Sequence, residues 1–248
     1  CGGKAILFAD DNITLAPSRF IKLCERIKSE GLNKIEFSIQ AEMVSLIRSP
    51  EIISAMAIAG IKNVLLSVDP PRRFANGVFN GRTSYPQKEI SDLLIKMKHN
   101  GMIVLGVFVE GYPDDNEELL WTDFHLAVKM GFDLAAFLAL TPFPGTRIRD
   151  ELLKMKLVTN CEDYSTYTTS ISNIRTKHMS AEQLTKTLRM MNARFLIESG
   201  TAFRLFLKYP KHILKRTINE LFYDHRNLFL RLEKQNLKHG IISNEILT

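Results

Sequence analysis

The fold of this chain is set by residues 101–109, GMIVLGVFV, in which a glycine precedes a run of apolar residues. Glycine tolerates the left-handed backbone conformation that ends many α-helices. A short, almost continuous apolar run is typical of a strand buried in a parallel sheet. This stretch therefore predicts a junction between a helix and a parallel strand.

The same pattern recurs along the chain. Further strands are predicted at residues 5–9, 35–39, 64–68 and 134–140, each shortly after a glycine. Apolar residues at helical spacing predict helices at residues 17–29, 51–59, 86–100 and 116–130. Strands that alternate with such helices indicate a parallel sheet with right-handed crossovers. Both an open sheet and a barrel fit this alternation, and five units predict a partial barrel.

The chain changes character after residue 140. A helix is predicted at residues 147–156, followed by a polar segment rich in Thr and Ser at 157–177. Ser180 and Gln183 have the spacing of a capping box, which predicts a long helix up to Ser199. We therefore expect a barrel domain at residues 1–156 and a polar connection with a mainly helical region at 157–248.

Composition indicates an enzyme-sized globular protein. The 248 residues are 45% hydrophobic and 24% charged, and no apolar run approaches the roughly 20 residues of a membrane span. With no signal-peptide pattern, a cytoplasmic location is expected. The first residue is Cys1 rather than Met, which predicts a start inside a longer chain. The three cysteines form neither a disulfide framework nor a zinc pattern, so no metal ligand is assigned.

The net charge of +6 is concentrated near the C-terminus. From residue 200 onward there are nine Lys or Arg and four Asp or Glu. This excess is interpreted either as a solvated helix face or as a surface for an anionic partner. A nucleic-acid partner is not expected.

Polar residues follow the predicted strands, where parallel α/β proteins place their functional groups. The five ends carry Asp10, Asp11 and Asn12; Gln40 and Glu42; Asp69; residues 110–115; and residues 141–146. Helix capping by Asp11 or Asn12 and a simple turn at 111–115 are structural alternatives. There is no Ser/His/Asp set, HExxH helix or Gly-rich phosphate loop, so no catalytic residue is assigned. This favours a cofactor that supplies the chemistry, although a phosphate- or sugar-binding barrel also fits.

Four segments, residues 8–12, 50–60, 108–115 and 140–146, resemble in order and spacing the radical S-adenosylmethionine proteins. The most similar branch has an N-terminal cobalamin-binding domain, and the resemblance extends from residue 4 to about residue 200. It implies an α/β fold, a partial (β/α)6 TIM-like barrel that lacks its first strand here and is followed by a helical C-terminal tail.

The resemblance also implies cofactors. A [4Fe-4S] cluster would be held by a CxxxCxxC motif outside this chain, and its fourth iron would bind S-adenosylmethionine. Reductive cleavage then yields a radical that abstracts hydrogen, or a methyl group passes through cobalamin. An external electron donor and a small-molecule or peptide substrate are implied, and the isolated fragment is expected to be inactive.

The resemblance assigns roles to individual residues. The cofactor-binding positions are Asp10, Asp11, Asn12, Gln40, Asp69, Val107, Val109 and Gly111. The positions that contact substrate or form a wall are Glu42, Thr141, Pro142, Gly145 and Thr146. A carboxylate near the sulfonium and ammonium groups of the cofactor would pair with their positive charge.

Some positions depart from the family pattern. Glu42 stands where arginine is common, Val44 where aspartate is common, and Ser67 replaces a glycine. These changes leave two interpretations, a divergent enzyme or a degenerate barrel that serves as a binding or scaffold module. In the second, Lys211, Lys215 and Arg216 of the basic tail would contact an anionic partner. An unrelated barrel lyase or aldolase would be expected to show a lysine at a strand end or a metal set.

Overall fold

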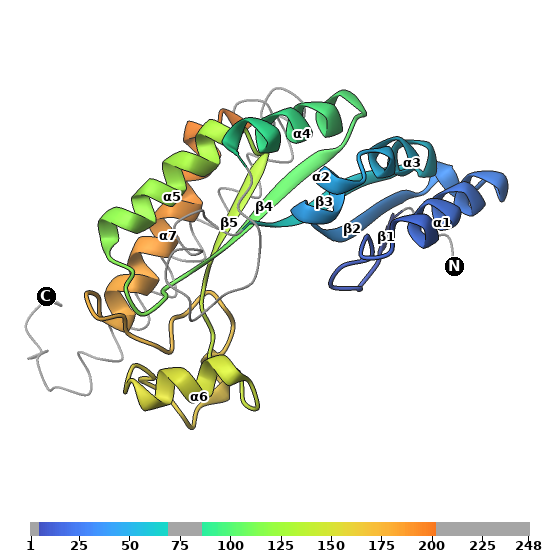
Figure 1. The fold of residues 1–248 in the computed structure, drawn as a ribbon. Coiled ribbons are helices and arrows are strands. Elements are labelled where there is room, and N and C mark those ends of the chain that lie inside the picture. The colour runs from blue at the N-terminus through green and yellow to red at the C-terminus, as the bar shows by residue number, and fades with distance from the viewer. Residues whose placement is uncertain (1–4, 69–85, 202–248) are drawn as a thin grey trace, which may run out of the picture. The chain divides into compact units, whose positions relative to one another are not determined.

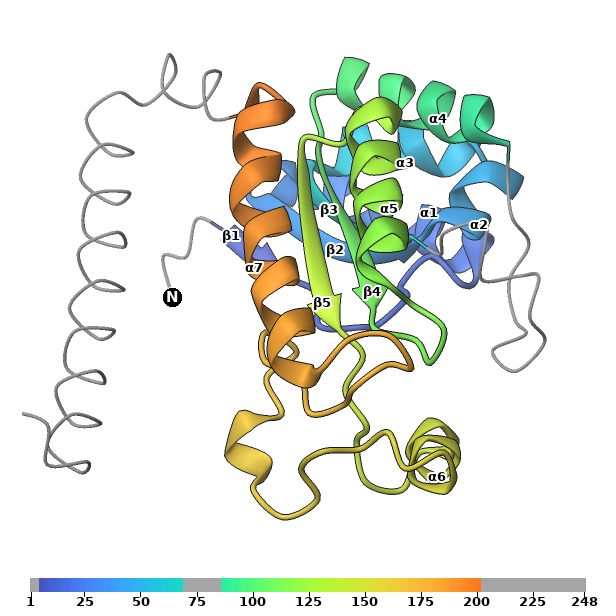
Figure 2. The ribbon, with the colours of Figure 1, turned by 90° about the vertical axis from the view of Figure 1, so that its left-hand side faces the viewer.

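The computed structural model describes residues 5–68 and 86–201. The chain divides into a compact unit of residues 1–199 and a second unit of residues 200–248. In the described part of the first unit, five parallel strands form one sheet in the order β1-β2-β3-β4-β5 (Figures 1 and 2). The strands are β1 (Ala5–Leu7), β2 (Glu36–Glu42), β3 (Ile61–Val68), β4 (Ile103–Glu110) and β5 (Leu134–Ala139). The predicted parallel α/β arrangement is confirmed, and the sheet has the form of a partial TIM-like barrel.

Helices lie between successive strands, and in the described part of the chain two further helices follow β5. They are α1 (Pro17–Ser29), α2 (Met43–Arg48), α3 (Glu51–Ala59), α4 (Gln87–His99), α5 (Glu117–Met130), α6 (Arg147–Lys154) and α7 (Ala181–Glu198), with short 3-10 turns η1 (Leu32–Lys34) and η3 (Tyr164–Thr166). The capping box of α7 is confirmed, because the Ser180 side chain accepts from the Gln183 amide and the Gln183 side chain accepts from the Ser180 amide. Helix α2 was not predicted; at six residues it is too short to show a clear period.

One face of the sheet is sealed by helices. Phe108 on β4 stacks on Phe137 of β5, with ring centroids 5.1 Å apart, and meets Phe132 edge-on at 5.8 Å. Phe124 of α5 and Phe195 of α7 reach Phe137 at 5.8 and 6.1 Å. Aromatic pairs at these separations add to the stability that burial supplies. This layer fixes α5 and α7 against β5.

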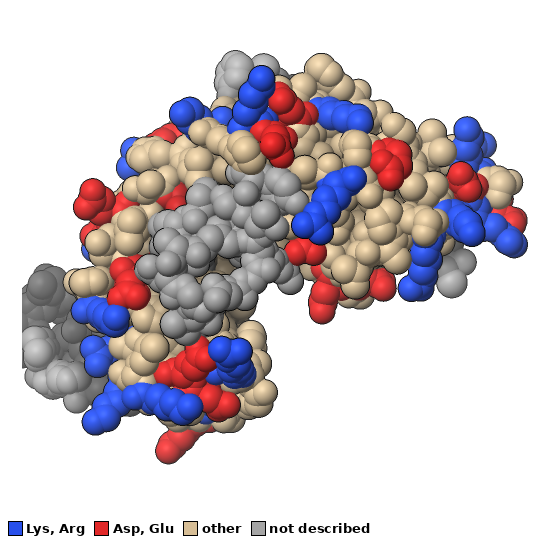
Figure 3. Space-filling model, in the orientation of Figure 1, with Lys and Arg blue, Asp and Glu red and all other residues tan. Residues whose placement is uncertain are grey.

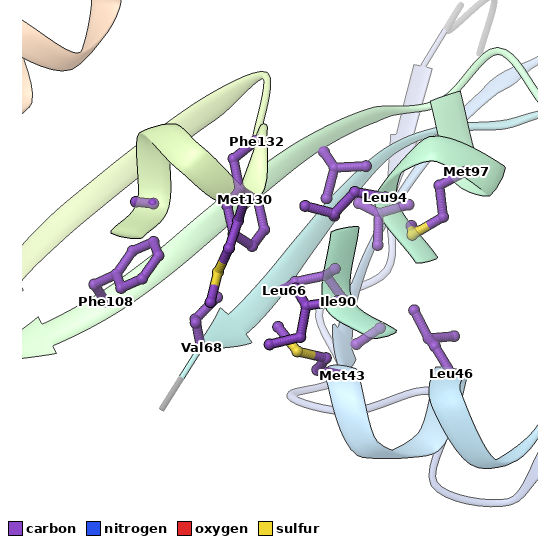
Figure 4. Close-up of a cluster of buried hydrophobic side chains, with 14 of the residues drawn as sticks. Met43, Leu46, Leu66, Val68, Ile90, Leu94, Met97, Phe108, Met130 and Phe132 are labelled. Carbon is purple, nitrogen blue, oxygen red and sulfur yellow. The ribbon is translucent and has the colours of Figure 1, made fainter. Parts of the chain in front are cut away.

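The same core continues under α2 and α4. Figure 4 shows apolar side chains of both helices gathered along β3. The cluster includes Met43 and Leu46 of α2, Leu66 and Val68 of β3, and Ile90, Leu94 and Met97 of α4. All are buried. The helix-facing residues of these strands are therefore committed to the core, and among the described residues the strands are more exposed on the opposite face.

Helix α7 also covers the outer edge of β5 (Figure 2). The Asn192 side chain accepts from the Phe137 amide and donates to the Phe137 carbonyl, both at 2.9 Å. Two residues further on, the Ala139 amide donates to the Thr169 carbonyl at 2.7 Å. Open strand edges invite pairing with other chains, so these bonds end the sheet at β5.

We expect Asn192→Leu to lower the free energy of unfolding by about 2–4 kcal/mol, because the amide and carbonyl of Phe137 lose their partner. Urea denaturation followed by circular dichroism measures the change. Asn100→Leu is the control, since the exposed Asn100 side chain donates only to the Lys96 carbonyl of its own helix. Equal losses for the two variants would contradict the edge-closing role of Asn192.

Candidate functional site

The sheet face opposite the helices gathers several of the predicted site residues. Cα pairing places Glu42, Ser67, Val107 and Ala136 in one row across β2 to β5. Side chains alternate between the two faces along a strand, so Gln40 and Val109 lie on the same face as this row. All these strands point the same way (Figure 1). The row starts at the last residue of β2 and passes one residue before the end of β3. The structure thus brings Gln40, Glu42, Val107 and Val109 onto one face.

The loop after β1 is tied to the end of β2. Asn12 Nδ2 donates to Glu42 Oε2 at 3.1 Å. Asn12 Oδ1 accepts from both the amide and the hydroxyl of the buried Thr14, at 3.2 and 2.8 Å. Because Oδ1 takes these two donors, the NH2 group is turned toward Glu42. The Ile13 amide adds a bond of 3.3 Å to the Gln40 carbonyl.

The structure tests whether Asp11 or Asn12 caps the helix that follows β1. The N-cap of α1 is Ala16, with no side-chain cap, so neither Asp11 nor Asn12 caps that helix. Asp10 and Asp11, which precede Asn12 in the same loop, are exposed. Asp69, the predicted residue after β3, lies outside the described residues.

The turn after β4 is held by a buried carboxylate. Asp115 Oδ2 accepts from the amides of Gly111 and Tyr112, both at 2.9 Å. Gly111 has φ of +95°, and a Cβ there would lie 2.6 Å from Leu184 Cδ2. The adjacent Glu110 is fully buried on the helix side of the sheet. Gly111 thus serves this turn, and its assignment to cofactor binding stays a prediction.

The segment after β5 is braced by its own side chains. The buried Thr141 hydroxyl donates to the Ala139 carbonyl at 3.0 Å. Thr146 caps α6, and Arg149 Nη1 donates to the Pro142 carbonyl at 2.9 Å. Gly145 is exposed in the turn between them. Arg149 was not predicted as a site residue. Arginines on a surface helix such as α6 usually face solvent, and no local motif marks this one.

The described residues offer no site for a metal cluster. No group of three or more His, Cys, Asp or Glu in residues 5–68 and 86–201 is arranged to hold a metal ion. Cys24 is buried on α1 and Cys161 is exposed in the loop after α6. Burial, aided by the negative charge of Glu25, raises the pKa of Cys24 from 9.0 to about 12. Its thiol is therefore protonated at neutral pH and unsuited to binding iron.

Within the same described residues, none of the helices has the length and apolar character that a membrane crossing requires.

A parallel α/β sheet with one sealed face and polar groups at the carboxyl ends of its strands defines the class of partial TIM-like barrel proteins. No family model matches the chain. Among curated proteins, an uncharacterized methyltransferase of Pyrococcus horikoshii is 30% identical over 222 residues, 89% of this chain and 47% of that protein. An anaerobic magnesium-protoporphyrin IX monomethyl ester cyclase of Cereibacter sphaeroides is 24% identical over 229 residues, 88% of this chain and 37% of that protein. The chain thus spans half or less of the length of these relatives.

Two solved structures share the fold. The radical S-adenosylmethionine methyltransferase TsrM from Kitasatospora setae, solved with cobalamin and a [4Fe-4S] cluster, aligns with a TM-score of 0.52 at 17% identity, over 61% of this chain and 29% of that chain. The radical S-adenosylmethionine enzyme coproporphyrinogen III oxidase from Escherichia coli aligns with a TM-score of 0.53 at 12% identity, over 79% of this chain and 41% of that chain. At 30% identity over 89% of its length, the chain belongs to the family of the Pyrococcus horikoshii protein. It shares its fold with two radical S-adenosylmethionine enzymes, one of them solved with cobalamin, which supports the predicted resemblance.

We expect Gly111→Ala to destabilise the protein by about 2–4 kcal/mol, because left-handed strain and the contact with Leu184 act together. Thermal and urea unfolding measure the loss. Gly131→Ala is the matched control, with φ of +86° and no atom within 4 Å of the added Cβ. If both variants lose the same stability, the contact with Leu184 has no effect.

In a Cys1→Ser background at pH 8, we expect iodoacetamide to alkylate Cys161 readily and Cys24 only after unfolding, as measured by mass spectrometry. Because the pKa of Cys24 is raised in the folded state, its protonated form stabilises the fold below about pH 9, and this contribution falls as the pH rises toward 12. Fast labelling of Cys24 in the folded protein would contradict its burial.

Proposed function

We propose that this chain is the barrel part of a radical S-adenosylmethionine enzyme, and that the open face of the sheet near Glu42 binds S-adenosylmethionine. The row of Glu42, Ser67, Val107 and Ala136 is the observation that carries the proposal. The shared fold of the two solved enzymes supports it.

The residues at this face fit the chemistry of that cofactor. S-adenosylmethionine carries fixed positive charge at its sulfonium and ammonium groups, and Glu42, Asp10 and Asp11 offer carboxylates at the neighbouring strand ends. Asn12 fixes the direction of the Glu42 carboxylate through its 3.1 Å bond. Val107 and Val109 supply an apolar surface two strands away, suited to the adenosyl part. When bound, the cofactor supplies a methyl group or, after reductive cleavage, the means to abstract hydrogen.

The iron-sulfur cluster and cobalamin are the two further cofactors that we propose. The described residues offer no ligand set for iron, so the thiolates for a [4Fe-4S] cluster must come from outside them. Cobalamin, with methyl transfer, is proposed by analogy with TsrM and the methyltransferase relative. We further propose that an external donor supplies the electron for reductive cleavage of S-adenosylmethionine.

A planar tetrapyrrole is the substrate class that we propose. The cyclase relative is named for magnesium-protoporphyrin IX monomethyl ester, a flat conjugated ring with carboxyl side groups. Sequence similarity to that enzyme extends over 88% of this chain. The substrate of the whole protein would then be large and flat.

The proposal is tested on the complete gene product, purified without oxygen. Iron and sulfide content, together with 5′-deoxyadenosine or S-adenosylhomocysteine formed after reduction, reports cluster and cofactor use. About four irons per chain and either product are expected. A complete protein with neither would refute the enzyme and favour the binding-module interpretation, whose residues Lys211, Lys215 and Arg216 lie outside the described residues.

We expect Glu42→Gln in the complete protein to raise the Kd for S-adenosylmethionine about tenfold, because it removes a charge that faces the cationic groups. Anaerobic equilibrium dialysis measures the Kd. Glu36→Gln is the control, since Glu36 is exposed at the opposite end of the same strand. Unchanged affinity in Glu42→Gln would remove Glu42 from the cofactor site.

A further inference from the structure

An arginine and three aromatic rings cluster beyond the carboxyl end of β5. Arg149, in the first turn of α6, donates from Nη1 to the Pro142 carbonyl at 2.9 Å and to the Tyr167 hydroxyl at 3.0 Å. The Tyr167 hydroxyl in turn donates to the Asn160 carbonyl at 2.6 Å. The guanidinium is therefore held in one orientation by two acceptors on a single nitrogen.

Of the residues that the structure describes, none accepts a hydrogen bond from one edge of this guanidinium. Among the described residues, Nε and Nη2 of Arg149 donate to no acceptor. These two nitrogens form the edge that binds a carboxylate through two parallel hydrogen bonds. The bond to Tyr167 raises the pKa of Arg149 above its ordinary value. An arginine guanidinium is in any case cationic at the pH values that proteins meet.

A chain of aromatic rings begins at the same arginine. The guanidinium carbon lies 5.8 Å from the centroid of Tyr164, whose ring meets Tyr167 at 5.1 Å. The Phe143 ring centroid lies 6.2 Å from that of Tyr167. Phe143 and Tyr164 are 45% and 53% exposed, although burial of such rings is favourable. Two exposed rings beside an oriented cation suit a flat, conjugated ligand that bears a carboxylate.

The position of this cluster connects it with the proposed site. Phe143 and the Pro142 carbonyl belong to the segment that follows β5, whose carboxyl end lies at the same edge of the parallel sheet as those of β2 and β4. Basic and acidic side chains are mixed around α6 in Figure 3, so net charge alone does not select an anion there. Selection of a carboxylate would rest on the orientation of Arg149.

We propose that Arg149, with Phe143 and Tyr164, forms a subsite that binds the carboxylate and ring edge of a planar tetrapyrrole substrate. This inference rests on the proposed substrate class. Arg149 contacts the carboxylate, the two exposed rings contact the conjugated plane, and Tyr167 is a positioning residue that holds the arginine.

Protoporphyrin IX and its dimethyl ester are the probes, because they differ only in free carboxylates. Binding to the complete protein is measured by fluorescence anisotropy of the porphyrin. We expect wild type to prefer the free acid, and Arg149→Gln to raise its Kd about tenfold while the Kd of the ester changes less than about twofold. Arg149→Lys, which keeps the charge and loses the planar fork, should recover only part of the affinity.

Arg147→Gln is the matched control, since Arg147 lies on the same helix turn but pairs with Glu151 at 2.9 Å. It should leave both Kd values unchanged, and thermal melts check that each variant is folded. Equal loss for acid and ester in Arg149→Gln would show a structural role and overturn the subsite. Wild type that binds neither porphyrin would overturn it too, whereas the proposed chemistry is judged separately by cleavage of S-adenosylmethionine.

Discussion

The backbone pairing of five parallel strands is the constraint on which the rest of the structure depends. Because side chains alternate along each strand and neighbouring strands keep their pairing, a residue's position in the register decides which face it serves. Phe108 and Phe137, which are paired, join the helix-side core, whereas Val107 and Ala136, one residue earlier, face the other way. A sealed face and a face available to ligands thus follow from one pairing pattern.

Strand pairing ends at β5, and the contacts that close this edge also hold the chain segment that follows the sheet. Asn192 of α7 satisfies Phe137, and the Thr169 carbonyl accepts from Ala139, so the chain beyond residue 157 is bound to the edge of β5. That segment also contains Tyr167, the residue that orients Arg149. Closure of the sheet edge and construction of the proposed carboxylate subsite therefore depend on the same stretch of chain.

Local sequence predicted the elements that local physics determines. The recurring pattern of a glycine followed by an apolar run predicted the five parallel strands, and the Ser180 capping box predicted the start of α7. Contacts between distant residues left no periodic signal: Asn192 is 55 residues from Phe137, and Arg149 is 18 from Tyr167. Asn12 was expected at a strand end, yet its partner Glu42, 30 residues away, was found only in the structure. The division at residue 156 and the roles of the individual site residues stay predictions.

The central claim is that the open face of the sheet near Glu42 binds S-adenosylmethionine. A crystal structure of the complete protein, grown without oxygen and with that cofactor, tests it most directly. The account predicts density for the cofactor across the row of Glu42, Ser67 and Val107, with its cationic groups toward Glu42 and the Asn12 loop. Density on the helix-covered face, or a bound cofactor that contacts none of these strands, would contradict it.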